Sequence, residues 1–558
     1  MPQSCTAQDI SSSSSPSMAA LTTLALLAGC LALLLLAPWA RRLVRHLLRV
    51  GRQVYLTLDV PGPACLPLLG TLPAFLRFWE DMEGTLLDLV AEYGPTVRFR
   101  MVDRVALLVM HPDDVQAVIT YLFLFSCTAF GYTAPGCARQ AVCTHPALVN
   151  KADQLVRSLR PFTGDGLLLL NGREHRAHRK AISPSLHFDI LRDFVAVFDK
   201  NSRALAERLG KHADDGRVFD VHREFGKLTS TTLQETVLSL SEDQGEGKAG
   251  DVFNVVGDLA LYRGMRPWWQ NDTVFRLLSP HYEQHKRAEE DMDTLVLRVL
   301  AARRAQVSRG GAPAPPRRRM AFLDHVLRSE EAHAMSEAEL RAELKTLLFA
   351  GSATSMDFLS YLTVVLTILP DVQARLQQEV DGVFGAPGSP GADRPLLPED
   401  LVHLDFLERV VKEALRLAPP VPMLFRQASS DVTLPRGVFV PEGTVVILVP
   451  AGTHRMPSVF PEPLRFDPDR FLPERSQGRH PYSFLPFSAG PRNCVGFRYA
   501  LMFVKTAVAN LMRSYTFVPP PSGAPRTLQE LHRRMQPGAT MTIKGGALVR
   551  LARRAPGS

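Results

Sequence analysis

Cys494 is the residue of this chain best placed to do chemistry. It lies in the segment PFSAGPRNCVGFRYA, where Gly490 and Gly496 predict a tight loop and an apolar helix is expected to follow. In such a loop backbone amides can approach the sulfur, and with the cation of Arg492 they stabilise a thiolate. A thiolate in front of an apolar helix can bind a metal at the centre of a flat, apolar cofactor that lies on that helix.

Haem is a cofactor that fits this description, because haem iron held by a cysteine thiolate receives electron density that favours O–O cleavage. Arg492 can meet a haem propionate, and Phe487 can shield the sulfur and tune its hydrogen bonding. The pattern F-x-x-G-x-R-x-C-x-G is filled by Phe487, Gly490, Arg492, Cys494 and Gly496. It resembles the haem-binding loop of the cytochrome P450 superfamily. A free cysteine in a loop is the alternative, but the number of fixed positions argues against a chance match.

Other stretches occur in the order found in that family. In KEALRLAPPVP, Glu413 and Arg416 match the E-x-x-R pair, one helical turn apart and able to form an ion pair, although a surface salt bridge has the same spacing. Arg470, in FDPDRF, matches the arginine that completes a Glu-Arg-Arg network in relatives. The resemblance implies that these three residues stabilise the region that carries the cysteine loop. Arg426 resembles a family arginine that reaches a propionate; an ordinary charge on a strand surface is the alternative.

The segment AGSATS resembles the oxygen-activation segment A-G-x-[D/E]-T-[T/S] of the family. Gly351 would let a ligand approach the backbone, and the hydroxyl of Thr354 would hold dioxygen or relay a proton. A stretch of small residues for helix packing is the alternative. Ala353 stands where relatives carry an acid, so water or another group must deliver the proton. Asp357, one turn further, points elsewhere on the helical wheel and is not a candidate.

The segment GREHRAHRKAISPSLH corresponds to a W-x-x-x-R pattern in which relatives use both residues to bind propionates. His175 replaces the tryptophan and can still donate a hydrogen bond, while Arg179 keeps the arginine. A basic, solvated helix face is the alternative for His175.

Long helical patterns surround these motifs and predict a mostly α fold with a small β region, the cytochrome P450 fold. The stretch Val97–Met110 predicts two strands around a turn at Asp103, and Phe188–Leu209 and Tyr282–Val307 are amphipathic. Further predicted elements are a long helix from Ser336 to before Pro370, begun by a capping box with Glu339, a helix over 371–385, a helix from about Pro398 to the double proline, and short strands in 432–450.

The amino terminus predicts a membrane anchor. Met18–Ala40 carries no charge and as a helix would span roughly 35 Å, enough to cross a bilayer core. Arginines follow it at once, which places the following residues in the cytosol and predicts an endoplasmic reticulum anchor. A cleaved signal peptide is the rival reading, but its positive charge should precede the apolar stretch. The predicted division is a lumenal head (1–17), the anchor (18–40), a basic linker (41–60), one catalytic domain (61–550) and a tail (551–558).

Composition limits the partners. With 46% hydrophobic and 22% charged residues the chain has an ordinary globular composition, and its net charge of +8 suits an anionic membrane or an acidic protein. No zinc-finger spacing or aromatic-basic RNA motif appears, so nucleic acid is the least favoured partner. The seven cysteines form no CxxC pair, which indicates a reducing compartment.

The resemblance, closest to the microsomal branch with the fatty-acid ω-hydroxylases, implies a haem b (iron protoporphyrin IX) monooxygenase with Cys494 as axial ligand. Electrons would come from NADPH through a separate flavoprotein reductase, with cytochrome b5 as a candidate second donor, because no G-x-G-x-x-G-led nicotinamide or flavin domain is visible. A lipophilic substrate is expected, with fatty acids or related lipids favoured. A haem-thiolate isomerase or dehydratase that needs no outside electrons, and a non-catalytic haem sensor, remain open.

Overall fold

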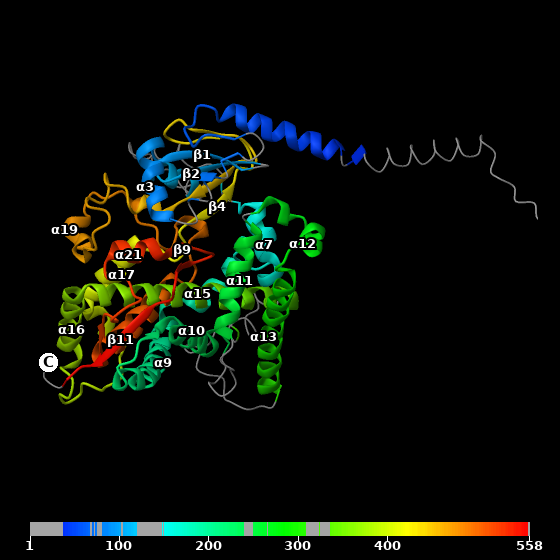
Figure 1. Cartoon of the computed structure of the whole chain (residues 1–558). Helices are drawn as coiled ribbons and strands as arrows, with labels where there is room; N and C mark the ends of the chain where they lie inside the picture. Colours follow the sequence, from blue (N-terminus) through cyan, green and yellow to red (C-terminus); the bar gives the residue numbers. More distant parts are fainter. Residues whose placement is uncertain are drawn as a thin grey trace, which may run out of the picture.

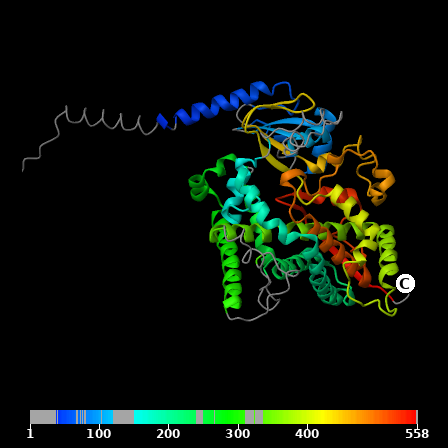
Figure 2. The same ribbon diagram turned by 180° about the vertical axis from the view of Figure 1, so that it is seen from behind.

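The chain forms a largely helical body with a small β region on one side, as the sequence predicts (Figures 1 and 2). This computed structural model describes residues 37, 38, 40–66, 70, 71, 73, 74, 77, 81–101, 104–119, 148, 150–238, 249–264, 266–308, 323 and 335–555. The helix α15 (Glu337–Ile368) runs through the middle of the body, and several other helices pack against it (Figure 1).

The other α-helices are distributed along the described chain. The α-helices are α3 (Met82–Tyr93), α4 (Pro112–Ile119), α7 (Asp153–Thr163), α8 (Gly172–Ile182), α9 (Phe188–Asp214), α10 (Val221–Leu238), α11 (Ala249–Gly264), α12 (Asp272–Leu278), α13 (Tyr282–Ser308), α16 (Pro370–Phe384), α17 (Asp405–Leu417), α18 (Pro450–Thr453), α19 (Pro473–Ser476), α20 (Phe497–Ser514) and α21 (Leu528–Arg534). The predicted helices at 188–209 and 282–307 are thereby confirmed, and both extend slightly further.

A mixed sheet forms the β region near the amino-terminal side. Its order is β1 (Thr96–Met101), β2 (Arg104–Val109), β7 (Val445–Leu448) and β4 (Leu424–Gln427), with β2 and β7 parallel and the outer pairs antiparallel. The predicted strand pair in 97–110 is confirmed, although its turn at Asp103 lies outside the described residues. The smaller sheets contain β3 (Phe219–Asp220), β5 (Val432–Thr433), β6 (Phe439–Val440), β8 (Tyr515–Val518), β9 (Met535–Pro537), β10 (Met541–Ile543) and β11 (Leu548–Arg553).

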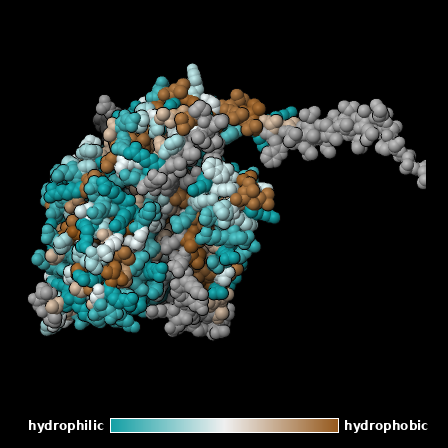
Figure 3. Space-filling model, viewed as in Figure 1, coloured by the Kyte–Doolittle hydropathy of each residue, from teal (hydrophilic) through white to brown (hydrophobic). Residues whose placement is uncertain are grey.

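An amphipathic helix over 40–56 leads into the body and carries exposed apolar side chains (Figure 3). Its exposed residues include Leu43, Leu47 and Leu48. Arg52 ties it to the body through an ion pair with Asp431. The predicted lumenal head and all but the last residues of the predicted anchor, Met18–Ala40, lie outside the described residues.

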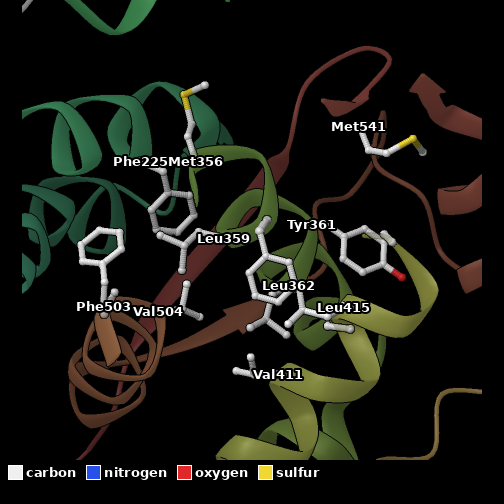
Figure 4. Packing of buried hydrophobic residues seen from close by; sticks show 14 of the residues in the cluster. Phe225, Met356, Leu359, Tyr361, Leu362, Val411, Leu415, Phe503, Val504 and Met541 are labelled. Carbon is white, nitrogen blue, oxygen red and sulfur yellow. The ribbon is translucent and has the colours of Figure 1, made fainter. Parts of the chain in front are cut away.

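Among the described residues, α15 alone is long and apolar enough by composition to cross a membrane, but most of it is buried inside the protein. The predicted capping box is confirmed: Ser336 and Glu339 bond each other's backbone amides at its start. The helix is apolar nearly all round because it is the centre of the core. Leu359 and Leu362 of α15 pack with side chains of α10, α17 and α20 (Figure 4).

The prediction of one continuous helix from about Pro398 to the double proline is wrong. The chain forms a short 3-10 turn over Asp400–His403 and then begins α17 at Asp405, because Leu404 between them leaves the helical conformation. The carboxylate of Glu379 accepts the amide hydrogens of Phe406 and Leu407, at 2.5 and 2.9 Å. This cap comes from α16, so it is invisible to local sequence patterns.

Candidate active site

A mostly apolar cavity of about 410 Å³ lies at the centre of the body. Its walls come from α7, α8, α11, α15, the 538–540 turn between β9 and β10, and the loop that precedes α20. Cys494, Thr354 and Gly351 all line it. The cavity therefore brings together motifs that lie far apart in the sequence.

The cysteine loop is a tight turn with two residues in the left-handed region, Ser488 at φ 59° and Gly490 at φ 63°. A Cβ on Gly490 would lie 2.5 Å from the backbone oxygen of Ile119, so this position needs glycine for its conformation and for space. The amide of Cys494 donates to the carbonyl of Phe487 at 2.9 Å, which closes the loop. Both Phe487 and Cys494 are thereby turned to the cavity.

Cys494 is exposed only in the sense that it borders the cavity, since the surrounding protein shields it from bulk water. Burial raises the pKa of its thiol, while the backbone amide of Gly496 and the charge of Arg179 act in the opposite direction. A thiol held this way is a poor free nucleophile. Coordination by a metal cation is the interaction that would favour its thiolate form.

Five basic side chains gather beside the cysteine loop: Lys151, His175, Arg179, Arg426 and Arg492. Burial lowers the pKa of Arg426 and of Arg492 to about 10, and with neighbouring cations it lowers the pKa of His175 to about 3. The pKa of Lys151 falls well below its usual value, chiefly through burial and then through Arg426 and Arg492. None of the described carboxylates acts on this cluster, which is the electrostatic signature of a site for an anionic ligand.

Two of these cations are held in place by neutral groups. Arg179 donates to the carbonyl oxygen and to the side-chain Oδ1 of Asn493, both at 2.6 Å. Arg492 donates to the carbonyl of Leu170 and to Oδ1 of Asn171, both at 2.6 Å, and its Nε has no partner among the described residues. The cluster therefore carries uncompensated positive charge, and Nε of Arg492 remains available to donate to a ligand. Two carboxylates on a flat apolar ring, as in haem b, fit both the cations and the apolar walls.

A second, fully buried network underlies the cysteine loop. Arg416 donates to both oxygens of Glu413, at 2.7 and 2.8 Å, and Nε of Arg470 lies 3.3 Å from Oε1 of Glu413. Arg416 also donates to the carbonyls of His454 and Pro463, at 3.0 and 2.7 Å. The network therefore fastens α17 to the segment that leads towards the cysteine loop.

The predicted oxygen segment lies on α15 against the cavity. The hydroxyl of Thr354 donates to the carbonyl of Ala350 at 2.7 Å, so it is oriented along its own helix. A Cβ on Gly351 would meet Leu233 of α10 at 3.0 Å, so packing against α10 needs this glycine in addition to any role beside a ligand. Ala353 is buried and apolar, so the position of the usual acid carries no proton.

Some residues of the site have no sequence motif. Lys151 and Asn171 join the cation cluster from segments that match no pattern, and only their closeness in the fold reveals them. Asp357, which was not a candidate from the sequence, has a carboxylate that accepts a hydrogen bond from Thr540, which lines the cavity. A charged residue within an otherwise apolar core helix was the available signal for Asp357.

Known proteins resemble this chain over most of its length. The family model described as Cytochrome P450 matches residues 119–546. Cytochrome P450 4V2 of Rattus norvegicus is 34% identical over 374 residues, which are 65% of this chain and 70% of that protein. Cytochrome P450 4c21 of Blattella germanica is 30% identical over 82% of this chain and 87% of its own, and cytochrome P450 4B1 of Rattus norvegicus is 32% identical over 69% and 75%. The range matched by the family model contains every site residue described above.

Proposed function

The chain belongs to the cytochrome P450 family of haem-thiolate monooxygenases, and we propose that it inserts one oxygen atom of O₂ into a lipophilic substrate, with a fatty acid or related lipid favoured. The observation that carries this proposal is the shared cavity: an apolar chamber with a cysteine in its wall and a cluster of uncompensated cations beside it. An apolar substrate and a flat dianionic cofactor are the ligands that such a chamber selects.

In this proposal Cys494 would hold the iron of haem b through its sulfur, and the bound haem would supply the activation of dioxygen. His175, Arg179, Arg426 and Arg492 hold the propionates, and Lys151 joins them. Phe487 and the amide of Gly496 shield the sulfur. The hydroxyl of Thr354, which lines the same cavity, would hold a proton there.

Electrons come from a separate NADPH-dependent flavoprotein reductase. The outward face of α8 supports this, because Arg173, Arg176 and Lys180 are exposed on it while His175 and Arg179 turn inward. Such a basic face suits an acidic partner, and it lies on the same helix as two of the proposed propionate residues. Cytochrome b5 is a candidate for the same surface.

A single-pass anchor in the endoplasmic reticulum membrane, with the catalytic domain in the cytosol, completes the proposal. Support comes from exposed apolar side chains on two elements at one side of the molecule, the helix over 40–56 and α12 (Figures 1 and 3). These are Leu47 and Leu48 on the helix over 40–56 and Leu277 and Leu278 on α12. Apolar groups beside a basic helix favour the surface of an anionic bilayer.

The test is turnover of the full chain in lipid vesicles with reductase and a panel of fatty acids, sterols and terpenoids. We expect oxygenated product from a fatty acid only when NADPH, reductase and O₂ are all present. Equal yield from a lipid hydroperoxide without NADPH would instead support the second candidate, a haem-thiolate isomerase or dehydratase. Ala353 favours that second candidate, because such a rearrangement needs no proton relay through an acid at this position.

A further inference from the structure

Asp357 is a buried acid that connects two parts of the fold. It lies on α15, one turn after Thr354, and is only 3% exposed. Its Oδ1 is 2.8 Å from Nε2 of His222, at the start of α10, and its Oδ2 accepts a hydrogen bond from the hydroxyl of Thr540. The buried carboxylate therefore links His222 and Thr540 through its two oxygens.

The two partners of Asp357 face different surroundings. Thr540 belongs to the 538–540 turn and lines the cavity together with Thr354 and Cys494. His222 is partly exposed, with a quarter of its side chain open to solvent. The three side chains therefore form a continuous row from the protein surface to the cavity wall, where α10, α15 and β10 meet.

The proposed reaction requires protons in the cavity, and this row of side chains can supply them. Insertion of one oxygen atom of O₂ into a substrate takes up two electrons and two protons and releases water, so protons must reach the cavity at each turnover. No Asp or Glu is among the described residues that line it, and Ala353 replaces the usual acid. Asp357 is a carboxylate in hydrogen-bond contact with a residue that lines the cavity.

We propose that His222, Asp357 and Thr540 form a proton relay from solvent into the cavity. The proposal rests on the monooxygenase function above. His222 takes a proton at Nδ1 from water at the surface and gives its Nε2 proton to Oδ1 of Asp357. Rotation of the neutral carboxyl brings this proton to Oγ1 of Thr540, whose own proton passes to a water molecule in the cavity. One proton enters, and the starting state is restored when the carboxylate turns back and His222 exchanges its Nδ1 proton for one on Nε2 through water.

Two further acids, Asp258 and Asp220, lie near this row. Asp258 of α11 lies near it, and burial together with the charge of Asp357 raises the pKa of the Asp258 carboxyl. Asp220 accepts the backbone amide of His222 at 3.1 Å. Among the described residues, His222 is the basic side chain that pairs with Asp357.

Asp357→Asn tests the relay, because the amide keeps the size of the side chain and an acceptor for Thr540 but cannot carry a proton. In the haem-loaded enzyme with reductase and NADPH, we expect product formation to fall about 10²-fold. The solvent deuterium isotope effect on the remaining turnover should change. The dissociation constant of the substrate, from a binding titration, and the unfolding temperature should change little. Asp199→Asn is the matched control, since Asp199 is also buried and accepts a hydrogen bond from Asn510, away from the cavity.

Substitutions of Thr540 give a second test, in which the Asp357 side chain itself is unchanged. Thr540→Val should lower turnover as Asp357→Asn does, and Thr540→Ser, which keeps a hydroxyl, should recover most of the loss. Full turnover in Asp357→Asn would overturn the relay, and so would a loss that appears only as weaker substrate binding. If the unaltered enzyme makes no NADPH-dependent product, the proposed function itself is wrong, and that result is separate from a failure of the relay.

Discussion

Arg416 and Glu413 form a two-bonded ion pair that is completely shielded from solvent. Nε and Nη2 of the guanidinium donate to the two carboxylate oxygens at 2.7 and 2.8 Å, and both side chains are 0% exposed. Arg470 adds a second cation to the same carboxylate. A buried pair of this kind is costly to break from one side, because the remaining charge loses its partner in a medium that cannot solvate it.

Glu413→Gln should therefore lower the free energy of unfolding by about 3–5 kcal/mol, measured by denaturant unfolding of the full chain. Arg465→Gln is the matched control. Arg465 pairs with Glu462 at the same three-residue spacing, but these side chains are 65% and 71% exposed. Its loss should cost less than about 1 kcal/mol. Equal small effects of the two substitutions would contradict the structural role given to Glu413.

The two glycines of the cysteine loop should respond differently to alanine. Gly490 has φ 63°, and its Cβ would meet the backbone of Ile119, so Gly490→Ala should destabilise the protein by about 1–3 kcal/mol. Gly496 has φ −94°, and no described atom lies within 4 Å of its Cβ, so Gly496→Ala should leave the unfolding midpoint nearly unchanged. Thermal unfolding of both variants measures the difference, and a larger loss at Gly496 would show that the loop geometry is wrong.

Arg426→Met should have opposite effects with and without the cofactor. The arginine is buried, and burial lowers its pKa to about 10, so its charge destabilises the empty protein. Its removal should raise the unfolding temperature of the apoprotein and weaken haem binding in a titration. Arg436→Met, at an exposed position, is the control and should change neither quantity. Stronger haem binding by Arg426→Met would contradict its place at a propionate.

His178 should make stability depend on pH. Its Nδ1 lies 2.6 Å from Oε1 of the buried Glu343, and this hydrogen bond is the main reason why the pKa of His178 is raised. The protonated imidazole therefore stabilises the fold fully below its ordinary pKa of about 6.5, and this contribution disappears as the pH rises through the higher folded-state pKa.

The measurement is the difference in unfolding temperature between the unaltered protein and His178→Gln across that range. The difference should shrink as the pH rises. A difference that grows with pH would mean that the sign of the His178 contribution is wrong.

The sequence was sufficient for features encoded in short segments. The cysteine loop depends on residues within one turn, and the capping box of α15 needs only Ser336 and Glu339. The Glu413–Arg416 pair follows from helical spacing, although only the fold shows that it is buried. Local patterns were enough for these features because each consists of contacts between residues only a few positions apart.

Features that depend on contacts between residues far apart in the sequence were not predictable in this way. The break before α17 depends on Glu379 of another helix, and Lys151 joins the cation cluster without any motif. Asp357 and Thr540 are 183 positions apart, and a helical wheel gives the direction of Asp357 but not what it meets there. The packing of long helices around α15 decides these contacts.

The most direct test of the account is the carbon monoxide difference spectrum of the reduced, haem-loaded full chain. Cysteine thiolate ligation predicts the long-wavelength Soret band of a haem-thiolate protein, and Cys494→Ser should abolish that band. The cysteine at position 65 provides the control, because Cys65→Ser changes the other free thiol among the described residues and should leave the band intact. A protein that binds no haem, or a Cys494→Ser variant that keeps the band, would contradict the central claim.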